Sequence, residues 1–147
     1  MTNKDNLKSK HVTGVVILIK GILMILIGII HTIAIYFEMQ EAFKYMAEDW
    51  AVEYAIWFGA TGAFFIFIGT IDLLSYPGLK KGAACAWRMA FCSSIFPALI
   101  VTPGAIYFLR DAEPAIVFPM TISLLGIVGS IVLLINHRRF TNSGDAS

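Results

Sequence analysis

Long apolar runs separated by short polar connections dominate the hydrophobic pattern of this chain. Four such runs cover about residues 12–37, 54–74, 82–108 and 114–135. A helix of about 20 apolar residues crosses a hydrocarbon core of about 30 Å, and lipid offers no partner to backbone amides outside a helix or a closed barrel. The pattern therefore predicts an all-α fold, in which residues 1–147 form a single integral membrane domain with four transmembrane helices in a bundle.

Composition strengthens the membrane prediction and narrows the range of functions. The chain is 58% hydrophobic and only 14% charged, whereas about a quarter of the residues of soluble domains are charged. Little of the chain is left for a soluble catalytic domain, and the common motifs for phosphate binding, zinc proteolysis and serine hydrolysis are absent. The first apolar run is longer than a signal-peptide core and has no small-residue cleavage site after it. We therefore expect it to be a retained helix, and we favour a non-enzymatic protein that does not bind nucleic acid.

The distribution of charge predicts the topology. Lysine and arginine accumulate in cytoplasmic segments near the ends of transmembrane helices. Basic residues gather in the N-terminal tail, in the connection between the second and third runs, and in the C-terminal tail, whereas the first connection is mainly acidic. This pattern predicts that both termini face the cytoplasm and that the protein is a multi-pass protein of the inner (plasma) membrane.

Small residues recur along one face of several runs. Close backbone packing drives helix association in lipid, so small residues line the contacts, and a seven-residue repeat favours a shallow left-handed crossing. Gly59 also lies in the second run, three residues before Gly62 and outside the seven-residue spacing. The glycines that we expect at the helix contacts are Gly14, Gly21 and Gly28 in the first run, Gly62 and Gly69 in the second, and Gly126 and Gly129 in the fourth.

Three charged residues lie within the apolar runs, where they are costly and usually face the protein interior. Counting residues from the run ends places Lys20, Asp72 and Arg88 in one layer of the cytoplasmic half. This suggests a charge network in which Asp72 pairs with Lys20 or with Arg88. The alternative is that the two basic side chains extend separately to the headgroups.

A candidate ligand pocket lies in the outer half of the predicted bundle. His31 shares the glycine face of the first run with Glu38, and Trp57 and Thr61 open the second run. A histidine beside a carboxylate is able to bind a ligand or to relay protons. The alternative is a packed histidine that a threonine hydroxyl satisfies. The sequence predicts no metal site.

Cysteines and prolines add little chemistry. Cys85 and Cys92 are two helical turns apart, roughly 10 Å, which is too far for a disulfide. Pro97 and Pro103 interrupt the third run, and interior prolines either bend or break a helix. The sequence leaves these two outcomes open.

Three short motifs resemble those of the small bacterial four-helix membrane proteins of the DoxX-like kind. They are Gly28-x-x-His31, the aromatic pair Trp57-Phe58, and Gly69-x-x-Asp72-Leu73-Leu74. The resemblance implies an inner-membrane four-helix bundle that associates at most with redox or stress-related partners, and it implies no catalytic residues. The prolines of the third run and the acidic first connection have no counterpart in that pattern.

The leading functional prediction is a small membrane protein that binds a small ligand or a membrane partner in the outer pocket. A small dimeric transporter or proton and ion pathway, using His31 and the Asp72 layer, is the first alternative. A subunit of a membrane redox complex is the second. No cofactor is predicted, although the sequence leaves haem and flavin open. The expected partners are the lipid bilayer and either a second copy of the chain or a membrane complex.

Overall fold

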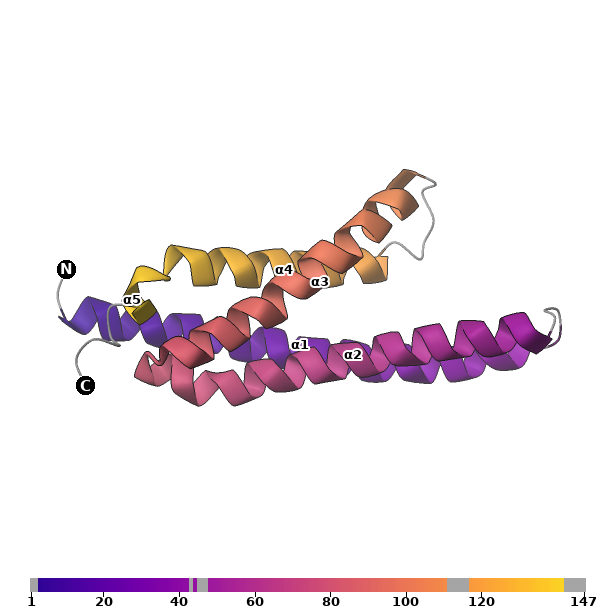
Figure 1. Cartoon of the computed structure of the whole chain (residues 1–147), viewed down its shortest axis with the longest axis horizontal. Helices are drawn as coiled ribbons and strands as arrows, with labels where there is room; N and C mark the ends of the chain where they lie inside the picture. Colours follow the sequence, from indigo (N-terminus) through magenta and orange to yellow (C-terminus); the bar gives the residue numbers. More distant parts are fainter. Residues whose placement is uncertain (1–2, 43, 45–47, 111–116, 142–147) are drawn as a thin grey trace.

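A computed structural model describes residues 3–42, 44, 48–110 and 117–141 of the chain. The elements are α1 (Asn3–Ala42), α2 (Glu48–Lys81), α3 (Ala84–Arg110), α4 (Val117–Ile135) and the short α5 (Arg138–Thr141). No strand occurs in these ranges. The all-helical fold expected from the sequence is therefore confirmed, with four long helices and one additional turn of helix after the fourth (Figure 1).

Three helices are long and apolar enough to cross a membrane. The segments concerned are Leu7–Ala34, Gly59–Lys81 and Ala84–Pro103. The apolar part of α4, Pro119–Ile135, is shorter. Residues 114–116, which the sequence assigned to the fourth span, lie outside the described ranges. The first two helices are much longer than their predicted spans, because the helices continue through the polar residues that border each apolar run.

Helices α1 and α2 form an antiparallel hairpin with a heptad register (Figure 1). A Cβ atom on Gly21 would lie 2.9 Å from the carbonyl oxygen of Gly69, and one on Gly28 would lie 2.7 Å from that of Gly62. The reciprocal distances are 2.5 Å and 3.0 Å. One heptad earlier, Gly14 faces the ring of Tyr76. The two backbones touch at these glycines, as expected for helices that pack through small residues in lipid.

A second hairpin forms from α3 and α4. A Cβ atom on Gly126 would lie 2.8 Å from both the amide nitrogen of Ala98 and the carbonyl oxygen of Ser94. Gly129 faces the Ser94 side chain one turn further along α4. Pro97 lies buried between these contacts, and α3 continues as one helix through Pro97 and Pro103. The prolines therefore do not break the helix, and α2 likewise contains Pro77.

The two hairpins join tightly at one end of the molecule, which we call the closed end. There the Ser9 hydroxyl donates to Asn136 Oδ1 at 2.6 Å, linking the first turns of α1 to the residue after α4. Phe140 of α5 is fully buried in a cluster with Ile17 and Leu79. Trp87 Nε1 donates to the carbonyl oxygen of Leu133 at 3.0 Å. The start of α1 and the end of the helical part of the chain therefore lie at the same end of the bundle (Figure 1).

A tight turn between α2 and α3 also lies at the closed end. Gly82 has a φ of 79°, a left-handed conformation that glycine adopts without the steric cost of a side chain. The amide of Ala83 donates to the carbonyl oxygen of Gly78 at 2.9 Å, and the amide of Gly82 donates to that of Leu79 at 3.0 Å. These bonds cap the last carbonyls of α2 and start α3 within three residues.

The opposite end is open by comparison. The α1–α2 hairpin continues beyond α4, and the later turns of α3 incline away from the hairpin (Figure 1). A second cluster of Met24, Phe65, Ile68 and Ile122 fills the middle of the molecule. At the level of this cluster, α3 and α4 are joined by a hydrogen bond of 3.1 Å from the Thr102 hydroxyl to that of Ser123.

Candidate functional site

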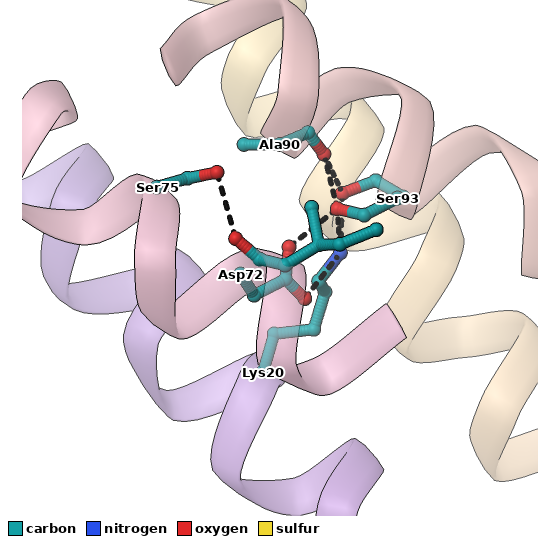
Figure 2. A network of polar contacts seen from close by, with 7 residues as sticks. Lys20, Asp72, Ser75, Ala90 and Ser93 are labelled. Atoms are coloured by element: carbon teal, nitrogen blue, oxygen red, sulfur yellow. Dashed lines mark hydrogen bonds and ion pairs between the residues drawn. The ribbon is translucent and has the colours of Figure 1, made fainter. Parts of the chain in front are cut away.

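An ion pair lies in the centre of the four long helices. Lys20 Nζ of α1 is 2.9 Å from Asp72 Oδ2 of α2. The Lys20 side chain is 3% exposed and that of Asp72 is fully buried. Figure 2 shows the lysine extending across the helix interface toward the carboxylate and the serine hydroxyls of α3. Of the two partners that the sequence offered to Asp72, the structure brings Lys20 to it.

Two adjacent serines of α3 complete the coordination of the pair. Lys20 Nζ donates to the Ser94 hydroxyl at 2.5 Å and lies 3.4 Å from that of Ser93. The Ser93 hydroxyl forms a very short hydrogen bond to Asp72 Oδ1. Both hydroxyls are also 2.8 Å from the carbonyl oxygen of Ala90 (Figure 2). The buried charges therefore have hydrogen-bond partners in addition to each other, which is the condition under which a buried pair is tolerated.

Glycines make room for these side chains. A Cβ atom on Gly21 would lie 2.7 Å from Cβ of Asp72. A side chain at position 21 of α1 would therefore collide with the base of the Asp72 side chain on α2. On α4, a Cβ atom on Gly129 would lie 2.7 Å from Oγ of Ser94 and 3.0 Å from Cδ of Lys20. All four long helices therefore contribute to the surroundings of the pair. The cation comes from α1, the anion from α2 and the hydroxyls from α3, and α4 packs against them through Gly129, which has no side chain.

The pair lies midway along the candidate spans. Lys20 is at the middle of Leu7–Ala34, and Ser93 is at the middle of Ala84–Pro103. The sequence predicts the charged layer in the cytoplasmic half, with a first span that begins at residue 12 and a second that ends at residue 74, and this depth stays a prediction. A charge within a span is costly unless it has partners inside the protein.

Arg88 does not belong to this network. It lies exposed on α3, and among the described residues the ion pair of Asp72 is with Lys20. Arg88 instead lines a groove between α2 and α3, together with Ser93. The three-residue charge layer expected from the sequence is therefore a buried pair and a separate exposed arginine.

The groove between α2 and α3 has a volume of about 470 Å³. Its walls are almost wholly apolar, and its described polar residues are Arg88 and Ser93. Because α2 and α3 are antiparallel, Ile71 and Arg88 lie toward the closed end, whereas Phe64 and Phe96 lie about 10–12 Å away toward the middle of the molecule. The complete lining is Phe64, Phe67, Ile68, Ile71, Arg88, Met89, Cys92, Ser93 and Phe96.

Ser93 belongs to both the groove and the ion-pair cluster. It is 3% exposed, lines the groove, and bonds to Asp72 on its other side. Ser93, Ser94 and, apart from Arg88, the groove residues were not among the site residues predicted from the sequence. The visible signal was the pair of hydroxyls at the centre of an otherwise apolar helix, because polar groups within a span seek a partner on another helix.

The outer pocket expected around His31 is only partly described. His31 is half-buried on α1, with its ring centroid 6.3 Å from that of Phe65 in an edge-to-face arrangement. Thr61 of α2 is also half-buried. The side chains of Glu38 and Trp57 lie outside the described residues. The groove between α2 and α3 is lined by neither His31 nor Thr61.

The described residues include no cluster of three or more metal-binding side chains. Cys85 and Cys92 are both free thiols on the exposed surface of α3. Comparisons with known proteins give no further guidance, since no family model, curated protein or solved structure matches this chain.

Proposed function

We propose that this chain is a multi-pass protein of the inner (plasma) membrane in which α4 is a fourth span and both termini are cytoplasmic. The apolar part of α4 has 17 residues, which is the lower limit for a spanning helix. An even number of spans agrees with the common end of α1 and α5. Exposed Lys80, Lys81 and Arg138 lie at this closed end, and basic residues favour the cytoplasmic side. The DoxX-like relationship remains part of this proposal.

We further propose that the protein binds a small molecule with a large apolar part, taken from the lipid phase, in the groove between α2 and α3. The single observation that carries this proposal is the groove itself, a concave apolar site of about 470 Å³ on a span surface. Sites for small molecules are typically apolar hollows of about 300–1,000 Å³ with a few polar groups. This moves the expected ligand site from His31 to the opposite face of α2.

Blocking the groove tests the proposal. Cys92 lines the groove, whereas Cys85 lies two turns away on the same helix and outside it. Both side chains are exposed, so a tryptophan is tolerated at either position. Native mass spectrometry of protein released from mild detergent should show a co-purified small molecule with wild type and Cys85→Trp, and a loss of that molecule with Cys92→Trp. Equal retention by both variants, or no bound molecule in wild type, would contradict groove binding.

A proton or ion pathway is the second candidate, and the central ion pair favours it. Charged residues at the middle of a span are costly and often mark ion pathways. Lys20 and Asp72 have compensating partners, so a structural role explains them as well. Proton flux into liposomes that Asp72→Asn abolishes, without a change in monomer yield, would favour the pathway. No flux above that of empty liposomes would exclude it.

A further inference from the structure

The apolar groove between α2 and α3 has a basic residue in its lining at one end and phenylalanines at the other. Arg88 is the charged residue among its lining, and it lies toward the closed end. The phenylalanines Phe64 and Phe96 lie toward the middle of the span. We propose that the groove binds a single-chain amphiphile with a carboxylate headgroup, placing the headgroup at Arg88 and the chain along the phenylalanines. This inference rests on the proposed ligand-binding function and names its ligand class.

The orientation of the groove matches that of an amphiphile in one leaflet. Arg88 lies within the second turn of α3, close to the end where the exposed Lys80 and Lys81 mark the membrane rim. A long arginine side chain at this depth lays its methylene groups on apolar surface and extends its guanidinium to headgroup level. An anionic headgroup occupies that level, and its chain points toward the bilayer centre, where the phenylalanines lie.

Charge complementarity selects an anion. Asp72, the acidic residue nearest to the groove wall, is fully buried and is neutralised by Lys20. The Ser93 hydroxyl, which separates Asp72 from the groove, is already bonded to the carboxylate. Arg88 therefore has no counter-ion among the described residues of the groove. A planar guanidinium matches a carboxylate with two parallel hydrogen bonds.

The volume selects a single chain. The groove volume of about 470 Å³ lies in the lower half of the range for small-molecule sites, about 300–1,000 Å³. A groove of this size suits one alkyl chain better than the two chains of a phospholipid. The exposed Phe67 and Phe96 at the rim add contact surface for one chain and leave the groove open to lipid on one side.

Photo-crosslinking in phosphatidylcholine nanodiscs tests the assignment with defined probes. A palmitate carrying a diazirine in its chain is irradiated with the protein, and the labelled residues are located by peptide mass spectrometry. We expect labelling at the groove residues of α2 and α3. Unlabelled palmitate should compete, and hexadecanol of the same chain length should compete about fivefold more weakly, because one basic residue near the headgroups contributes about 1 kcal/mol to binding an anion.

Arg88 variants separate charge from structure. Arg88→Gln should lower the apparent affinity for palmitate about fivefold and leave that for hexadecanol unchanged, and Arg88→Lys should restore most of the loss. Lys81→Gln removes an exposed charge from the same end but outside the groove, and it should have no effect. Because Arg88 is exposed and outside the ion pair, neither variant should change the unfolding of the protein.

Each of the other possible results would overturn a different part of the proposed ligand assignment. Equal competition by palmitate and hexadecanol, or an Arg88→Gln variant that binds palmitate normally, would overturn the carboxylate headgroup while groove binding stands. Stronger competition by a two-chain phosphatidylglycerol would overturn the single chain. Labelling spread evenly over all lipid-facing surfaces, with every probe, would overturn groove binding itself.

Discussion

The closed and open ends of the molecule use the same kind of helix and reach different degrees of packing. At the closed end, α5, Trp87 and the link between Ser9 and Asn136 hold both hairpins together. At the open end, the α1–α2 hairpin extends alone and α3 inclines away (Figure 1). The ion pair lies at the boundary between them. The difference shows that the closed end is held both by a buried apolar cluster around Phe140 and by the bond from Ser9 to Asn136.

The largest effect should come from removing one member of the ion pair. Lys20→Met leaves a buried carboxylate and Asp72→Leu leaves a buried ammonium, and breaking a buried pair in this way costs about 3–5 kcal/mol. The double variant removes both charges and should recover most of the free energy of unfolding. Denaturant unfolding in mixed micelles measures all four proteins. Single variants that unfold like wild type would show that the pair and its serine partners do not stabilise the bundle.

An intermediate effect should come from the glycines of the α1–α2 contact. Gly21→Ala places a methyl group 2.7 Å from Asp72 Cβ, and such overpacking costs about 1–3 kcal/mol. Gly59→Ala, toward the open end, meets nothing within 4 Å, so its higher helix propensity should stabilise the protein by up to about 1 kcal/mol. The same unfolding assay compares the two variants. If Gly21→Ala and Gly59→Ala destabilised the protein equally, the two positions would be packed equally tightly, which would contradict the structural difference between them.

The smallest effects should come from single hydrogen bonds between α3 and α4. Trp87→Phe at the closed end removes the bond from Nε1 to Leu133 and should cost about 1 kcal/mol. Thr102→Val, further from the closed end, removes the bond to Ser123, and such interhelical bonds in membranes average about 0.6 kcal/mol. Denaturant unfolding of the two variants under the same conditions compares their losses in free energy of unfolding. A larger loss for Thr102→Val would reverse the comparison.

Apolar run length predicted the helices well, because lipid leaves a buried backbone few alternatives. It predicted their ends poorly, since helices extend beyond the hydrocarbon where polar residues such as Lys80 still favour helix. At the contacts, Gly59 lies outside the seven-residue repeat, and a Cβ atom added to it would meet nothing within 4 Å.

The candidate site was predicted only in part. Lys20 and Asp72 stood out as charges in apolar runs, but the choice between Lys20 and Arg88 depends on which side chains of α3 turn into the bundle. Ser93 and Ser94 turn inward to the pair, whereas Arg88 is exposed and lines the groove. The groove was beyond sequence reasoning, because its hollow results from the spacing of two helices whose apolar lining resembles any lipid-facing surface.

The most direct test of the account is the distance between the charged groups of Lys20 and Asp72 in a lipid bilayer. Solid-state NMR on protein labelled with ¹⁵N at lysine Nζ and ¹³C at the aspartate carboxylate measures it, with Lys20→Met assigning the signal. We predict strong dipolar coupling between the Lys20 ¹⁵N and the Asp72 carboxylate ¹³C, because Nζ and Oδ2 are 2.9 Å apart. The coupling should be lost in Lys20→Met. A wild-type spectrum without that coupling would contradict the central ion pair to which Ser93 and Ser94 of the second hairpin are bonded.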